Sequence, residues 1–154
     1  LRNAAAIADS ETFRTTHQLV YNASDRLYLM GVALWDWNDQ GFEGASGAST
    51  RNLYSAGIRP VYFLTDHIAL QAEYGIDYVD QVRWAEGDRD GYLQKLTIAP
   101  TIKPAGGFWT RPEIRLFATY AWWSDEFSGL GIGGPAYSDD TAGWSFGIQT
   151  ETWW

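Results

Sequence analysis

The residue types that could do chemistry lie in the last third of the chain. The terminal stretch from Trp144 to Trp154, WSFGIQTETWW, alternates between two sets of residues, so on an extended strand its side chains point to opposite sides. One face is apolar with aromatic ends, and the other is polar but holds Trp153. The preceding stretch TRPEIRLFATYAWW alternates too, and Trp109 stands just before it. The polar faces of these two stretches carry Arg111, Glu113, Arg115, Gln149 and Glu151.

This combination of residue types suits the binding of a sugar. A sugar ring has a face of C–H groups and an edge of hydroxyls. An aromatic ring such as that of Trp109 or Trp153 can contact the face, while a charged group such as Arg111, Arg115 or Glu151 hydrogen-bonds to the edge. Such contacts are weak and repeated, so a solute that enters can also leave.

Catalysis and metal binding are weaker interpretations. Glu113 and Glu151 could form a glycosidase pair, since neighbouring strands can bring carboxylates to the ~5–10 Å that this chemistry needs. Arg111 and Arg115 flank Glu113 on the same face and favour its charged form, which does not suit a general acid. Acidic pairs at 125–126 and 139–140 could hold calcium but are more often solvated loop positions. We therefore expect no enzyme activity, no metal and no cofactor.

Composition and charge narrow the class of protein. The 154 residues are 45% hydrophobic and 16% aromatic, which allows one domain with a core or a lipid-facing band. No run approaches the roughly 18 apolar residues of a transmembrane helix, whereas membrane-spanning strands are compatible with the sequence. The net charge of −8 argues against nucleic acid as a partner. The chain starts at Leu1 without an initiator Met, so we expect it to be part of a longer protein.

Alternating segments run along the whole chain, with almost no helical periodicity. Their connections are alternately short and long, a pattern that is typical of outer-membrane barrels and that soluble sandwiches have no reason to keep. Charges in mid-strand fall on the face opposite the apolar residues, where a watery lumen tolerates them and a packed core would not. We expect strand ends, bulges or kinks at Pro60, Pro100 and Pro112. The predicted strands cover residues 12–22, 27–37, 52–64, 67–79, 92–103, 109–122 and 144–154.

Two long stretches resemble a known family. The sequence FWTRPEIRLFATYAWW, followed by a loop and WSFGIQTETWW, resembles the C-terminal end of the maltoporins, trimeric sugar-selective porins of Gram-negative outer membranes. The upstream stretches GIRPVYFLTDHIALQAEYGIDYV and LQKLTIAPTIKP are similar to the family's preceding strands in order and spacing. The resemblance implies an all-β, antiparallel transmembrane β-barrel of about 18 strands. Residues 1–154 would supply about the last seven of them, as the C-terminal part of one outer-membrane domain.

The resemblance also implies a function and its residues. In maltoporins a lumenal strip of aromatic side chains carries the apolar faces of sugar rings, and Trp109 and Trp153 match two of its positions. The solute would be an oligosaccharide such as a maltodextrin, the surroundings outer-membrane lipid, and the assembly a homotrimer. Trp109 could instead belong to an interfacial aromatic belt. The polar lumen lining would comprise Glu73, Arg111, Glu113, Arg115, Gln149 and Glu151.

Two further expectations concern the sheet. Seven antiparallel strands cannot close on themselves, because the first and last would be parallel, so we expect an open, curved sheet with unpaired edges. Another outer-membrane barrel, including a barrel enzyme, and a soluble all-β carbohydrate-binding module are the alternative interpretations. The polar lining should face the concave side, and lipid or neighbouring subunits should meet Leu70, Tyr74, Ile114, Leu116, Phe146 and Ile148.

Overall fold

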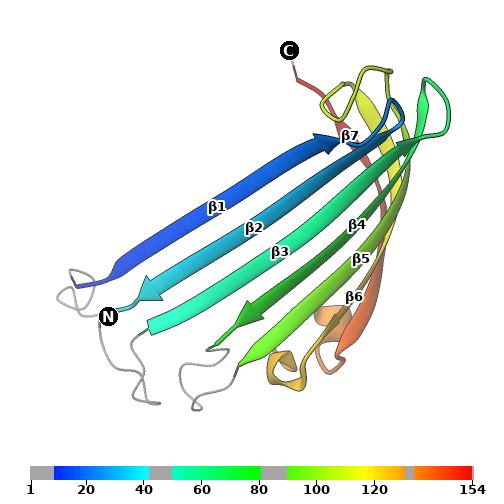
Figure 1. Cartoon of the computed structure of the whole chain (residues 1–154). Coiled ribbons are helices and arrows are strands. Elements are labelled where there is room, and N and C mark those ends of the chain that lie inside the picture. Colours follow the sequence, from blue (N-terminus) through cyan, green and yellow to red (C-terminus); the bar gives the residue numbers. More distant parts are fainter. Residues whose placement is uncertain (1–8, 42–49, 81–89, 131–133, 154) are drawn as a thin grey trace.

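The computed structural model describes residues 9–41, 50–80, 90–130 and 134–153 of the chain. Seven antiparallel strands form one sheet in which each strand pairs with the next along the chain (Figure 1). The predicted all-β class and the predicted number of strands are therefore confirmed. No helix in these ranges is long and apolar enough to cross a membrane. The strands are β1 (Glu11–Asn22), β2 (Leu27–Asp39), β3 (Thr50–Phe63), β4 (Ile68–Val79), β5 (Gly91–Ile102), β6 (Glu113–Trp123) and β7 (Ala142–Glu151), and the short 3-10 helices η1 (Asp125–Phe127) and η2 (Pro135–Tyr137) lie between β6 and β7.

The sheet is curved and open, as predicted. β1 and β7 form its two edges, and they do not pair with each other in the part of the chain that the structure describes. The connections 23–26, 64–67 and 103–112 gather at one end of the sheet, near the end of β7 (Figure 1). Each edge strand presents unpaired backbone groups on its outer side, so the sheet can accept a further strand at both edges.

The strand register separates an apolar face from a polar one. Residues directly opposite each other on paired strands share a face. Arg115 is opposite Gln149, and Glu113 is opposite Glu151, so all four lie on one face. The side chains predicted to face outward lie on the other face and are 37% to 71% exposed, which confirms the predicted register: Leu70, Tyr74, Ile114, Leu116, Phe146 and Ile148.

Strand ends, bulges or kinks were predicted at the prolines, but Pro60 and Pro100 lie inside β3 and β5 and each leaves a gap in the ladder on one side of its strand. The β3–β4 register passes from Ile58 opposite Tyr74 to Val61 opposite Gln71, which leaves Pro60 unpaired with β4, although it is still opposite Leu29 on β2. The β5–β6 register breaks in the same way around Pro100. Proline lacks a backbone N–H, so it cannot donate to a neighbouring strand.

Aromatic side chains form a row on the apolar face, close to the end of the sheet with the long loops. Phe13 on β1 lies 5.6 Å from Trp35 on β2, measured between ring centroids, and Trp35 lies 6.5 Å from Tyr54 on β3. Tyr54 in turn lies 6.4 Å from Tyr78 on β4. Tyr and Trp prefer the boundary between lipid and water, so this row marks one edge of a membrane-facing band.

The segment 103–112 corrects the prediction for the sixth strand. β6 begins at Glu113 and not at Trp109, because Pro112 cannot donate to the ladder and the preceding residues turn inward. Phe108 is buried against Val61, Phe63 and Ala69, on β3 and β4. The same cluster includes partly buried apolar residues from β1 and β2, so the segment folds across the concave side of the sheet: Val20, Tyr28 and Met30.

We predict that the two faces respond oppositely to a charge. Ile98 and Thr97 are neighbours on β5, and Ile98 lies on the exposed apolar face. Ile98→Arg should lower the free energy of unfolding by about 2–4 kcal/mol in a lipid bilayer, because an arginine at mid-membrane depth must leave water. The matched variant Thr97→Arg should cost less than about 1 kcal/mol, because the concave side is polar. Urea unfolding in lipid vesicles measures both, and a larger loss for Thr97→Arg would contradict the assignment of faces.

Candidate solute-binding site

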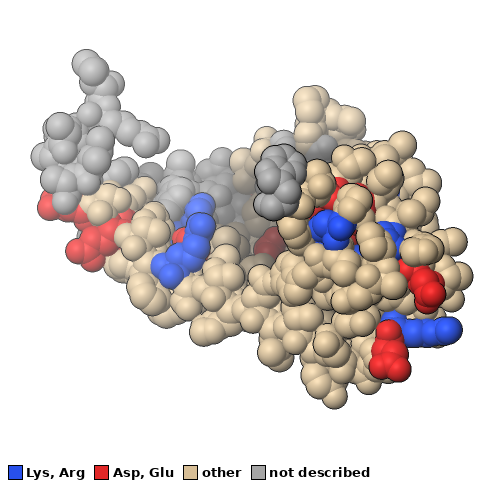
Figure 2. Space-filling model, turned by 90° about the horizontal axis from the view of Figure 1, so that it is seen from above, with Lys and Arg blue, Asp and Glu red and all other residues tan. Residues whose placement is uncertain are grey.

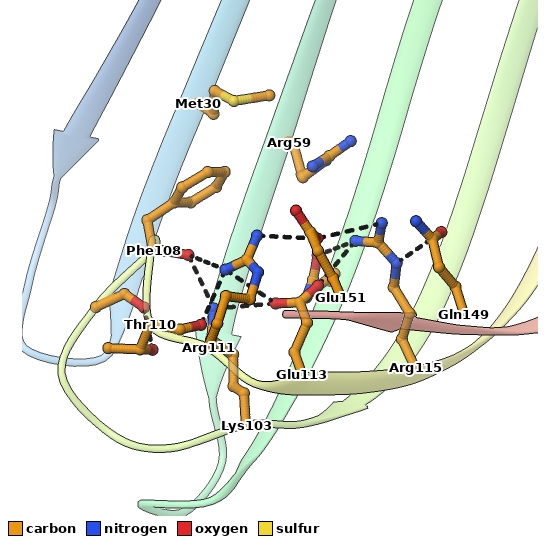
Figure 3. Close-up of polar contacts among 12 residues, drawn as sticks. Met30, Arg59, Lys103, Phe108, Thr110, Arg111, Glu113, Arg115, Gln149 and Glu151 are labelled. Atoms are coloured by element: carbon orange, nitrogen blue, oxygen red, sulfur yellow. Dashed lines mark hydrogen bonds and ion pairs between the residues drawn. The ribbon is translucent and has the colours of Figure 1, made fainter. Parts of the chain in front are cut away.

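A buried carboxylate surrounded by cations organises the concave side near the short turns. Glu113, only 2% exposed, sits at the start of β6. Its Oε2 lies 3.2 Å from Lys103 Nζ and 3.3 Å from Arg111 Nη1, and its Oε1 lies 3.0 Å from Arg115 Nη1. Figure 3 shows these side chains pointing toward one another across the concave side. We call Lys103, Arg111, Glu113, Arg115 and Glu151 the ion-pair cluster.

Strand pairing explains how Glu151 joins the cluster. Glu151, the last residue of β7, lies directly opposite Glu113 in the register. Arg111 Nη2 is 3.0 Å from Glu151 Oε2, so the two nitrogens at the end of one guanidinium bind two different carboxylates. Arg115 Nη2 is 3.9 Å from the same oxygen. The cluster thus holds three cations and two carboxylates, and each carboxylate is compensated by more than one cation.

The ion-pair cluster also fixes the segment that precedes β6. The Phe108 carbonyl oxygen accepts hydrogen bonds from Lys103 Nζ at 2.9 Å and from Arg111 Nη1 at 3.1 Å. Thr110 Oγ1 lies 2.9 Å from the carbonyl oxygens of both Pro104 and Gly107, which share its one O–H donor. Desolvation lowers the pKa of Lys103, and the Glu113 carboxylate opposes that shift. The segment is therefore tied to the sheet by charged groups as well as by the burial of Phe108.

The two predicted strip residues lie together beside this cluster. Their ring centroids are 6.4 Å apart and their planes are tilted by 48°. Trp109 is 52% exposed and Trp153 is 50% exposed, so each presents about half its surface. Neither belongs to a strand: Trp109 is in the inward-folded segment, and Trp153 lies two residues beyond the last residue of β7. The guanidinium carbon of Arg111 lies over the Trp153 ring, 4.2 Å from its centroid.

The residues predicted to form the polar lining are of two kinds. Some are buried and support the surface, and others are accessible on it. Arg111 and Glu113 are almost wholly buried, so they support the surface and do not form it. Glu73 lies apart from them and pairs with Arg59. Arg115 Nε donates to Gln149 Oε1 at 3.1 Å, which links the cluster to β7. A hollow of about 200 Å³ is lined by residues that include Arg59, Gln71, Glu73, Thr97, Arg115 and Gln149.

Sequence reasoning missed several members of this site. Lys103 and Gln71 lie on the predicted polar face, and alternation alone could have included them. Phe108 gave no such signal, because its burial depends on the inward turn of 103–112. In the view of Figure 2, acidic and basic side chains lie beside one another in small groups on an otherwise uncharged surface. That arrangement follows from pairing across strands, which a single strand's sequence does not reveal.

Comparison with known protein families agrees with the fold. The family model described as LamB porin matches residues 2–154, nearly the whole chain. The chain belongs to the LamB porin family. The resemblance to maltoporins is confirmed by this match, and the open sheet of seven strands is consistent with part of a porin barrel. LamB porins are sugar-selective channels of the bacterial outer membrane, so this chain belongs to a class of channels.

In this LamB porin chain, the geometry of Glu113 and Glu151 argues against a glycosidase site. Glu113 is buried beneath three cations and cannot reach a solute. Arg111 binds both carboxylates at once, so neither is free to act alone. The pair is better explained as the structural centre of the site than as a catalytic acid and nucleophile.

We predict that Glu113 contributes strongly to stability. Glu113→Gln should destabilise the porin by about 3–5 kcal/mol, because it leaves buried cations without their shared counter-charge. The matched variant Glu73→Gln removes a carboxylate that is substantially exposed, so it should cost at most about 1 kcal/mol. Urea unfolding in detergent or lipid compares the two. Equal losses for both variants would contradict the central place of Glu113.

Proposed function

We propose that this chain forms the C-terminal strands of a trimeric maltoporin-like channel in a Gram-negative outer membrane. Oligosaccharides of the maltodextrin type would cross it by facilitated diffusion. Trp109 and Trp153 would be the last members of a lumenal aromatic strip, close to the periplasmic end. Residues Glu73, Arg111, Glu113, Arg115, Gln149 and Glu151 would supply or support the polar lining. The N-terminal strands of the barrel would come from chain outside residues 1–154.

The observation that carries the proposal is the half-exposed pair Trp109 and Trp153 beside a charged cluster. The rings come from segments far apart in sequence, and the fold brings their centroids to 6.4 Å. Aromatic planes can contact the C–H faces of a sugar chain, and the charged groups nearby can bind its hydroxyls. Trp109 packs against Phe108, with ring centroids 4.9 Å apart, and about half of each Trp ring stays exposed, which supports contact with a solute.

The opposite face of the sheet supports a membrane channel over a soluble sugar-binding module. Large apolar side chains on the convex face are exposed along every strand, for example Leu19, Ile58, Leu70 and Phe146. An apolar surface of this extent requires lipid or another protein to cover it. The two open edges equally require further strands. Both requirements are met when the sheet is one wall of a larger barrel in a bilayer.

Ion-current measurements on the complete porin test this function. Trp109→Ala and Trp153→Ala should each weaken the block of ion current by a maltodextrin by roughly two- to tenfold, where tenfold corresponds to about 1.4 kcal/mol. The conductance for small salts should change little, because the pore stays wet and its charges remain. Trp144→Ala is the matched control, since Trp144 is equally exposed but belongs to the apolar face.

The outcome that contradicts the proposal is equally specific. If properly assembled Trp109→Ala and Trp153→Ala channels are blocked by sugar as strongly as the unsubstituted channel, the two rings are structural aromatics. A loss of sugar block in the Trp144→Ala channel as large as in the other two would also contradict it, because the effect would then not depend on the lumen.

A further inference from the structure

The contact between Arg111 and Trp153 is not explained by charge pairing. The guanidinium carbon lies over the indole ring, 4.2 Å from its centroid. A cation over an aromatic face is attracted by the electron-rich ring, and the attraction is stronger when the cation is withdrawn from water. The Arg111 side chain is only 5% exposed. This ring contact is therefore of the buried and stronger kind.

Arg111 is itself held in place from several sides. Its Nη1 donates to the carbonyl oxygens of Phe108 at 3.1 Å and Thr110 at 2.9 Å. Two ion pairs, to Glu113 at 3.3 Å and to Glu151 at 3.0 Å, fix the plane of the guanidinium. Its Nε is buried and makes no hydrogen bond with the described residues. The group is a rigid platform, and the Trp153 ring lies on it.

Trp153 has little else to fix its orientation. It lies two residues beyond Glu151, the last residue of β7, and among the residues that the structure describes no strand pairing holds its backbone. Residues beyond the last strand are mobile unless a side chain anchors them. The described ring contacts of Trp153 are with Arg111 and with Trp109, and Trp109 is itself half exposed. Arg111 is the better anchor because it is buried and multiply bonded.

We propose that Arg111 is a positioning residue for the solute site. It occupies one face of the Trp153 ring, fixes the ring's tilt toward Trp109, and leaves the opposite face for the apolar side of a pyranose. The inference rests on the proposed sugar-channel function. A ring that is already ordered costs less entropy to bind than a mobile one, so the platform strengthens solute binding without touching the solute.

The variant Arg111→Lys separates the stacking of the Arg111 guanidinium on Trp153 from the positive charge of this residue. Arg111→Lys keeps the positive charge for Glu113 and Glu151 but lacks the planar group that lies over an aromatic face. In the complete channel this variant should weaken maltodextrin block by roughly two- to fivefold. In the Trp153→Ala background the same change should have a clearly smaller effect, because only the contacts of Arg111 with the segment that carries Trp109 remain to be lost.

Arg115→Lys is the matched control for this cycle. Arg115 pairs with the same two carboxylates, Glu113 and Glu151. Whatever change Arg115→Lys causes should be the same with Trp153 and with Ala at that position. Equal effects of Arg111→Lys in both backgrounds, or no effect in either, would overturn the positioning role. An unchanged sugar block in Trp153→Ala alone would instead overturn the proposed function.

A direct observation of the ring keeps the inference testable if Arg111→Lys fails to assemble. The unsubstituted channel is labelled with 5-fluorotryptophan, and the Trp153 resonance is assigned by its absence from the Trp153→Phe spectrum. We expect a broad fluorine signal from an immobilised ring without any sugar present. A narrow signal typical of a freely rotating terminal side chain would overturn the role of Arg111. In assembled Arg111→Lys channels the signal should narrow, and in Arg115→Lys channels it should not.

Discussion

The burial of Glu113 among three cations is the interaction on which the rest of the site depends. A carboxylate removed from water is costly unless ion pairs and hydrogen bonds replace its hydration. Lys103, Arg111 and Arg115 supply that replacement, and two of them also bind the Phe108 carbonyl oxygen. The same contacts therefore satisfy a buried charge and hold the segment before β6 on the concave side. Trp109 is carried on that segment, so its position follows from the ion pairs.

The two faces of the sheet are suited to two different solvents, the convex face to lipid and the concave face to water. Its convex face is apolar and rimmed by aromatic rings, and its concave face carries paired charges and hydrogen-bonding side chains. Strict alternation along each strand is the only way for one layer of backbone to present both faces. Within the described residues, a cluster of buried apolar side chains forms where Phe108 folds over β3 and β4. Elsewhere the concave side keeps hollows lined by polar groups, as a wet pathway requires.

Alternation made the strands, their order and their faces predictable, because its period matches the backbone itself. The turn of 103–112 was not predictable in the same way. Trp109 continues the alternation of β6, yet the segment leaves the sheet because Pro112 cannot pair and Phe108 finds a pocket on other strands. The pairing of β6 with β7 brings Trp109 and Trp153 together at one end of the sheet. The platform provided by Arg111 was not predictable from the sequence, because it depends on how Trp153, beyond the end of β7, lies over the cluster.

The central claim is that a sugar chain binds the Trp109 and Trp153 pair on the side away from Arg111. The most direct test is a crystal structure of the complete porin with a bound maltodextrin. We predict a pyranose ring against the free face of Trp153 and in contact with Trp109, with the Arg111 guanidinium unmoved beneath the indole. Sugar density confined to other parts of the lumen, with both rings left bare, would contradict the account.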